Sequence, residues 1–227
     1  MPNLYVIATP IGNLEDMTLR GIRVLGEVDA ILCEDTRVTA KLLQKYDIQK
    51  TLISYHSHSK LSKVEKVFEL LAEGKNLALV SDAGTPCISD PGVMLVSEIR
   101  ERMSRFRLDI HIVPIPGPSA VISALSASGL PSSEFLFLGF LPHKKGRETL
   151  FKEIAASERT VAFYESPHRI LKALESLQKF APKKKIVIAR ELTKIYEEFV
   201  SGTATELLAH FEAHKDTVRG EFVIIVR

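Results

Sequence analysis

Short runs of aliphatic and β-branched residues alternate with longer stretches of helical periodicity along almost the whole chain. In the first half, these runs cover residues 4–8, 30–33, 51–55, 77–80 and 110–113. The stretches between them place apolar residues on one helical side, as residues 64–71 do with the spacing i, i+3, i+4 and i+7. Strands that alternate with amphipathic helices form βαβ units, so the sequence predicts an α/β fold with a mostly parallel sheet.

The second half repeats this alternation after a cluster of proline and glycine at the midpoint of the chain. Its predicted strands cover residues 135–139, 161–164, 186–189 and 222–226. The cluster has the sequence Pro-Ile-Pro-Gly-Pro and is typical of a link between domains. We therefore expect two α/β lobes of similar size, residues 1–113 and residues 119–227, joined by a linker at residues 114–118.

Two pairs of residues match the capping box, in which a Ser or Thr is followed three residues later by Glu. The pairs are Ser62 with Glu65 and Thr203 with Glu206. Each pair predicts that a helix begins directly after its first residue.

Composition excludes several classes of protein. The 30 lysines and arginines against 28 acidic residues give a net charge of +2, so the chain is not a strongly basic nucleic-acid coat. Two cysteines are too few for a disulfide framework and favour a reducing compartment. No apolar stretch approaches the roughly 18 residues of a membrane span, and the N-terminus lacks a secretory signal pattern. We expect a cytoplasmic protein that does not enter a membrane.

Several common catalytic motifs are absent from the sequence. It contains no phosphate-binding P-loop, no glycine-rich dinucleotide fingerprint and no nucleophile elbow. Two histidine pairs have spacings that suit a metal, His56 with His58 and His210 with His214. Neither pair has a nearby cysteine or an obvious third ligand, so we expect ordinary histidines and no metal.

Turn-rich segments follow the predicted strands. They comprise residues 8–13, 33–37, 81–92, 116–120 and 164–169. Turn chemistry alone explains any one of them, but five such turns with charged residues inside favour a binding site. Ligands of open parallel sheets bind beyond the carboxyl ends of the strands, where small residues let a ligand approach the main chain.

These turns and their flanking strands carry motifs of one family. The matching segments are LYVIATPIGNLEDMTLR (4–20), ILCEDTR (31–37), ALVSDAGTPCISDPG (78–92), PIPGPSA (114–120), FLGFLP (137–142), FYESPHRI (163–170), ARELTKIYEEF (189–199) and GEFVIIV (220–226). Together they resemble the tetrapyrrole methylase superfamily of S-adenosylmethionine-dependent methyltransferases. Within it they resemble the branch that methylates the 2′-hydroxyl of a cytidine in small-subunit ribosomal RNA, rather than the precorrin methylases.

The resemblance implies two α/β lobes with S-adenosyl-L-methionine in a cleft between them, and it implies a homodimer. The implied cofactor contacts are Pro10, Ala83, Gly84, Thr85, Ile88, Ser119, Ala120, Tyr164, Glu165 and Leu192. Binding is expected to be mostly through the main chain, which fits the absence of the Rossmann glycine motif. The implied substrate is 16S ribosomal RNA, alone or within the 30S subunit.

Three carboxylates at the predicted strand ends could remove the proton of a ribose hydroxyl. They are Asp35, Glu34 and Glu165. Asp35 is the first choice, with Arg37 binding a phosphate or orienting the acid. The alternative for Glu34 and Asp35 is that they cap the helix that begins near Thr36.

A charged loop at residues 143–147 would contact RNA phosphates if it lines the cleft. The resemblance implies that members of this branch usually continue past the last strand into a small helical tail, whereas this sequence ends at Arg227. Two other functions stay open. One is a methyltransferase for a small planar, tetrapyrrole-like substrate, and the other is a non-catalytic S-adenosylmethionine-binding module.

Overall fold

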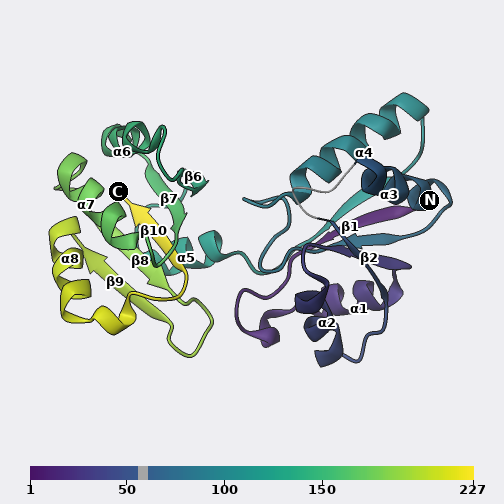
Figure 1. The fold of residues 1–227 in the computed structure, drawn as a ribbon, viewed down its shortest axis with the longest axis horizontal. Helices are drawn as coiled ribbons and strands as arrows, with labels where there is room; N and C mark the ends of the chain where they lie inside the picture. The colour runs from purple at the N-terminus through teal and green to yellow at the C-terminus, as the bar shows by residue number, and fades with distance from the viewer. Residues whose placement is uncertain (56–60) are drawn as a thin grey trace. The chain divides into compact units, whose positions relative to one another are not determined.

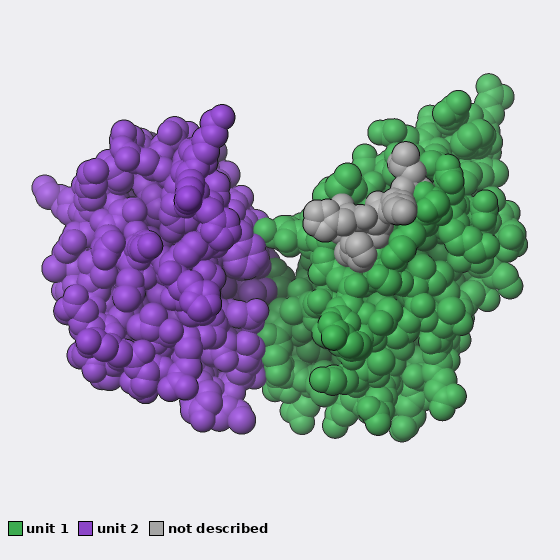
Figure 2. Space-filling view, viewed as in Figure 1, with its two compact units in different colours: residues 1–119 green, residues 120–227 purple. Residues whose placement is uncertain are grey.

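A computed structural model describes residues 1–55 and 61–227 of the chain (Figure 1). The chain forms two compact units, which Figure 2 shows in different colours. Unit 1 contains residues 1–119 and unit 2 contains residues 120–227. Residues 114–118, predicted as a linker, therefore belong to unit 1.

Unit 1 is built on a five-stranded sheet whose strands are all parallel. The strands are β1 (Asn3–Ile7), β2 (Ala30–Cys33), β3 (Thr51–Ser54), β4 (Leu77–Leu79) and β5 (His111–Ile115), in the order β3-β2-β4-β1-β5. The helical elements are η1 (Leu14–Asp16), α1 (Leu19–Glu27), α2 (Thr36–Lys45), α3 (Leu61–Ala72) and α4 (Gly92–Phe106). The predicted parallel α/β architecture is confirmed for this unit.

Both faces of the unit 1 sheet are covered by helices, which form two separate cores (Figure 1). On one face, Leu4 and Leu32 pack with residues of α3 and α4. On the other face, Ile7 and Ile31 pack with residues of α1 and α2. Strands buried on both faces are why these segments are nearly continuous apolar runs rather than alternating ones.

Three details of unit 1 differ from the prediction. Strand β5 continues through Pro114 to Ile115 instead of ending at Val113, which a proline permits because β5 lies at the edge of the sheet. Helix α1 was not predicted, since two glycines lower its propensity, but Thr18 caps it. The predicted cap at Ser62 is wrong, because α3 already begins at Leu61.

Unit 2 contains a second five-stranded sheet. The strands are β6 (Phe135–Phe140), β7 (Thr160–Glu165), β8 (Ile186–Arg190), β9 (Glu198–Gly202) and β10 (Phe222–Val226), in the order β6-β7-β10-β8-β9. The helical elements are α5 (Ala120–Ser128), α6 (Arg147–Ala156), α7 (Ile170–Phe180), α8 (Ala204–Ala213) and η2 (Lys215–Thr217). Helices α6, α7 and α8 pack on one face, and α5 contacts β7, β8 and β10 (Figure 1).

The prediction of a mostly parallel sheet is wrong for unit 2. Only β6 and β7 are parallel neighbours, and the other three pairs are antiparallel. The unpredicted strand β9 follows β8 as a hairpin, which reverses the chain direction. Helix α8 then returns the chain so that β10 inserts between β7 and β8. The Thr203 and Glu206 capping box that begins α8 is confirmed.

In each unit, the carboxyl ends of several strands share one edge of the sheet. In unit 1, the strands β1, β2, β4 and β5 are all parallel, so their carboxyl ends lie at the same edge. In unit 2, β7 and β8 are both antiparallel to β10 and therefore parallel to each other and to β6. The turn-rich segments accordingly gather at one edge of each sheet.

Candidate functional site

Main-chain hydrogen bonds join the turns after β1 and β4 at the carboxyl edge of unit 1. The Thr9 N–H donates to the Gly84 carbonyl at 2.9 Å, and the Gly84 N–H donates to the Thr9 carbonyl at 3.0 Å. The buried Thr9 hydroxyl also donates to the Ser81 carbonyl at 3.0 Å. This bridge fixes the neighbouring Pro10, which is buried, and brings two of the predicted turns together.

The Gly84 turn requires a glycine. Its φ of +84° lies in the left-handed region, and an added Cβ would lie 3.4 Å from the Ile11 side chain. The next residue, Thr85, donates its hydroxyl to the Pro118 carbonyl at 2.9 Å. The turns after β1, β4 and β5 thus form one connected main-chain surface, with Ala83 exposed on it and Ser119 following directly.

Asp35 forms the N-cap of helix α2. Its Oδ1 accepts the Arg37 N–H at 2.8 Å, and its Oδ2 lies 2.6 Å from the Arg37 guanidinium. These hydrogen bonds lower the pKa of Asp35 from 3.8 to about 2. The capping interpretation is confirmed, and a carboxylate with so low a pKa accepts a proton poorly at neutral pH.

Glu34, the neighbouring candidate, has the opposite electrostatic environment. Burial raises the pKa of Glu34 above its usual value of 4.5, and the negative charges of Asp90 and Asp82 raise it further. Asp82 also accepts the backbone N–H of Asp35 at 3.1 Å, so β2 and β4 are linked here. The pKa values of these two adjacent carboxylates are therefore shifted in opposite directions.

At the carboxyl edge of unit 2, Glu165 is completely buried between two arginines. Its Oε2 lies 2.7 Å from Arg147 Nη2, and its Oε1 lies 2.8 Å from Arg169 Nη2. Oε1 also accepts the Ser166 N–H at 2.9 Å. The two guanidinium groups, whose side chains are 14% and 15% exposed, further donate to the carbonyls of Pro142 and Leu141.

We call Arg147, Glu165 and Arg169 the arginine clasp, because they tie the end of β6 to the starts of α6 and α7. Both carboxylate oxygens of Glu165 are engaged within it. Sequence reasoning placed Glu165 at a strand end but missed its partners. The sequence does place both arginines close to predicted helix starts, but only the tertiary structure shows that they pair with Glu165.

Tyr164 connects β7 to the start of helix α5. Its hydroxyl accepts the Val121 N–H at 3.3 Å, next to Ala120, and burial raises its pKa. Its ring packs against Phe137 and Phe140, with centroid separations of 4.9 and 5.3 Å. An irregularity in the β6–β7 register at Gly139, whose φ is +60°, gives both phenylalanines access to this ring.

Leu192 and Ile88 lie in loops at the carboxyl ends of β8 and β4. Leu192 is 8% exposed, whereas Ile88 is 47% exposed. The predicted site residues therefore fall on one edge of each sheet. All of the predicted cofactor contacts lie at these two edges.

The sequence profile of one protein family, the Tetrapyrrole (Corrin/Porphyrin) Methylases, matches residues 3–208 of the chain. The chain belongs to the tetrapyrrole methylase family. The "Ribosomal RNA small subunit methyltransferase I" of Halalkalibacterium halodurans is 48% identical to it over 224 residues, covering 98% of this chain and 75% of the relative. The protein of the same name from Thermotoga maritima is 43% identical over 226 residues, covering 100% of this chain and 98% of the relative.

Two solved methyltransferase structures share the fold. The methyltransferase CobJ superposes with a TM-score of 0.71 at 20% identity, covering 100% of this chain and 94% of CobJ. The cobalt precorrin-4 methyltransferase CbiF gives a TM-score of 0.66 at 20% identity, covering 99% and 94%. The expected tetrapyrrole methylase fold is thereby confirmed. The chain thus spans three quarters of the Halalkalibacterium halodurans protein and nearly all of the Thermotoga maritima protein.

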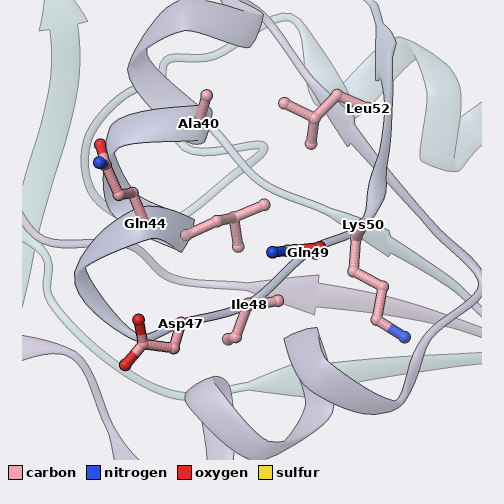
Figure 3. Close-up of a pocket in the computed structure, with 8 residues that line it drawn as sticks. Ala40, Gln44, Asp47, Ile48, Gln49, Lys50 and Leu52 are labelled. Atoms are coloured by element: carbon pink, nitrogen blue, oxygen red, sulfur yellow. The ribbon is translucent and has the colours of Figure 1, made fainter.

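Unit 1 also has a surface hollow of about 400 Å³, whose lining residues Figure 3 shows. It is lined by Ala40, Leu43, Gln44, Asp47, Ile48, Gln49, Lys50 and Leu52. These residues belong to the later part of α2 and the segment that enters β3, so the hollow lies toward the amino ends of the strands. It shares no residue with the predicted site.

The described residues contain no group of three or more His, Cys, Asp and Glu side chains arranged to hold a metal ion. His210 and His214 lie side by side on α8 and its C-cap, with ring centroids 4.6 Å apart. The other histidine pair, His56 and His58, lies outside the described residues. Across residues 1–55 and 61–227, none of the helices combines the length and the apolar character needed to cross a membrane.

Proposed function

We propose that this chain is an S-adenosylmethionine-dependent methyltransferase that methylates the 2′-hydroxyl of a cytidine in 16S ribosomal RNA. The observation that carries the proposal is its identity of 43% and 48% with two proteins named as ribosomal RNA small subunit methyltransferases. These matches extend through both units, so they include every strand-end turn of the candidate site.

The carboxyl edge of unit 1 has the features that an S-adenosylmethionine site needs. Gly84 removes a side chain where a ligand would approach the main chain, and Ala83 leaves the adjacent backbone exposed. Thr85 and Ile88 would hold the methionine and ribose part of the cofactor. When bound, the cofactor supplies a methyl group on a sulfonium, so no metal is needed for the chemistry.

In unit 2, Tyr164 and Leu192 would contact the adenosine part of the cofactor, and Glu165 would lie beside it at the same strand end. Ser119 and Ala120 would contribute main-chain groups at the start of α5. The Tyr164 hydroxyl supports this assignment because it holds the first turn of α5. The neighbouring arginine clasp supports a rigid backbone rather than a direct contact from the Glu165 carboxylate.

The base that receives the ribose proton is a strand-end carboxylate in this proposal. Asp35, with Arg37, and Glu165 were predicted for this role, and Glu34 was the third candidate. Hydrogen bonds occupy the carboxylates of Asp35 and Glu165, whereas the raised pKa of Glu34 favours it as the proton acceptor. Arg37, whose side chain is 86% exposed, has a charge available for an RNA phosphate.

We also propose that the RNA is contacted by the exposed lysines Lys144 and Lys145 in the loop between β6 and α6. A cytoplasmic homodimer is the proposed form of the enzyme. Strand β6 supports the dimer because it is an edge strand with Leu136 at 48% and Phe140 at 57% exposure. Light scattering at micromolar concentration would give the mass of two chains, and the mass of one chain would refute the dimer.

Methyl transfer to several acceptors tests the proposal. Purified protein is incubated with labelled S-adenosylmethionine and either 30S subunits, naked 16S RNA or a tetrapyrrole. We expect incorporation into the ribosomal substrates alone. Incorporation into the tetrapyrrole would support the alternative substrate, and cofactor binding without transfer to any acceptor would support a binding module.

Cofactor binding has its own test in Gly84→Val. The valine would introduce a β-branched side chain at a φ of +84°, with its Cβ 3.4 Å from Ile11. We expect calorimetry to show weakened or abolished binding of S-adenosylmethionine. Gly74→Val is the matched control, because Gly74 has a φ of +87° and open space around its Cβ position. Equal affinities of wild type and Gly84→Val would exclude this turn as the cofactor site.

A further inference from the structure

The loop that follows β4 holds two non-glycine residues in the left-handed backbone region. Cys87 has a φ of +71° and Ser89 a φ of +60°. Residues other than glycine, asparagine and aspartate rarely adopt this backbone conformation, so the surrounding structure must hold the backbone in place. The two residues flank Ile88, whose apolar side chain is 47% exposed.

A single carboxylate oxygen closes this loop. Asp90 Oδ1 accepts the Cys87 N–H at 3.0 Å and the Gly92 N–H at 2.8 Å. The carboxylate fits there because Gly92 has no side chain, since an added Cβ would lie 2.7 Å from Asp90 Oδ1. At the other end, the Thr85 hydroxyl anchors the loop to the Pro118 carbonyl at 2.9 Å.

A left-handed pair also occurs at the carboxyl end of β8 in unit 2. Leu192 lies between Glu191, with a φ of +49°, and Thr193, with a φ of +66°. The Thr193 N–H donates to Glu197 Oε2 at 2.5 Å. Strained non-glycine backbone thus brackets an apolar residue at one strand end of each sheet. The remaining left-handed non-glycine residues of the described chain follow helices α2 and α4, where this conformation is ordinary.

We propose that Asp90 is a positioning residue for S-adenosylmethionine, because its two hydrogen bonds hold the left-handed loop that presents Ile88 and the adjacent main chain to the cofactor. This inference rests on the proposed function. Asp90 acts through the loop and does not itself touch the cofactor. Its oxygen acts as an acceptor, so an amide oxygen in the same place serves equally well.

Three substitutions separate the acceptor from the charge. Asp90→Asn keeps the oxygen and removes the charge, Asp90→Ala removes both, and Asp90→Glu keeps the charge but moves the oxygens by one methylene. Asp29→Ala is the matched control. Asp29 also accepts a backbone N–H, from Asn76 at 2.8 Å, but it lies at the amino edge of the same sheet.

Calorimetry with S-adenosylmethionine gives the decisive comparison. We expect the Kd to rise at least tenfold in Asp90→Ala and Asp90→Glu, and to stay within threefold of wild type in Asp90→Asn and Asp29→Ala. If Asp90→Ala does not fold, Asp90→Glu against Asp90→Asn carries the same test. Wild-type affinity in Asp90→Glu or Asp90→Ala would overturn the proposal, as would an equal loss of affinity in Asp90→Asn.

Hydrogen–deuterium exchange without ligand provides a second readout. The peptide that contains the Cys87 and Gly92 amides should exchange faster in Asp90→Ala than in wild type or Asp90→Asn. Unchanged exchange would show that Asp90 does not hold the loop. If the wild-type protein fails to bind S-adenosylmethionine at all, the proposed function fails and with it the cofactor role of Asp90. The exchange result then separates that failure from a wrong assignment of the loop.

Discussion

Replacing Glu165 with glutamine tests the arginine clasp. The substitution keeps the shape of the side chain and one acceptor oxygen but removes the negative charge between Arg147 and Arg169. Both guanidinium groups lie within 2.8 Å of the carboxylate, whose side chain is 0% exposed. In Glu165→Gln the two positive charges would face each other with no anion to compensate them.

The expected loss of stability follows from this burial. Removing one partner of a buried ion pair typically costs about 3–5 kcal/mol, because the other charge stays buried without compensation. The arginine side chains are 14% and 15% exposed, so water can stabilise them in part and the lower end of that range applies. For a chain of this length, about 3 kcal/mol corresponds to a decrease in Tm of roughly 6–12 °C.

Differential scanning calorimetry of wild type, Glu165→Gln and a control variant measures this decrease. Glu148→Gln is the matched control, because Glu148 pairs with Lys152 on the surface of α6 in the same unit. We expect the control to unfold at the wild-type temperature. A Tm of Glu165→Gln within 2 °C of wild type would refute the reasoning that Glu165 compensates two buried charges.

Three further predictions concern charged residues at the carboxyl edges. Glu34→Gln should lower kcat by about 10²–10⁴ and Asp35→Asn by much less, and the reverse order would restore Asp35 as the base. The lowered pKa of Asp35 stabilises the folded protein above pH 3.8, and this contribution is lost as the pH falls through about 2, so the Tm difference between wild type and Asp35→Asn should shrink over that interval. A constant difference between pH 4 and pH 2 would contradict the low pKa. Lys144→Ala combined with Lys145→Ala should raise the KM for RNA and reduce the salt dependence of binding, with a slope smaller by roughly 1.4–1.8, and unchanged RNA binding would remove this loop from the interface.

The strands of unit 1 were predictable because each is a short, mainly apolar run, and the central strands β2 and β4 are buried along their whole length. Sequence periodicity also located the helices around Val67 and Leu174, whose apolar positions recur every three or four residues. Strand β9 escaped prediction because it lies at the edge of its sheet and its residues are half-buried or exposed. The insertion of β10 beside β7 depends on tertiary pairing, which no local pattern encodes.

The candidate site was predictable as a set of turns but not as a set of contacts. The turn at Gly84 could be predicted because glycine in a strand-end loop marks a tight turn, and the structure gives this residue a left-handed φ of +84°. The partners of Glu165 come from two different helix starts, and the acceptor role of Asp90 depends on the exact backbone path through Cys87. Such contacts arise from the folded chain and leave no periodic signal.

Nucleoside analysis of the methylated RNA tests the central claim most directly. The 30S subunits that lack the modification are incubated with the protein and S-adenosylmethionine, and the RNA is digested to nucleosides and analysed by mass spectrometry. The account predicts one new 2′-O-methylcytidine per subunit, formed in equal amount with S-adenosylhomocysteine and located by fragment sequencing at a single cytidine. A methyl group on a base, or no methylated cytidine despite cofactor binding, would contradict it.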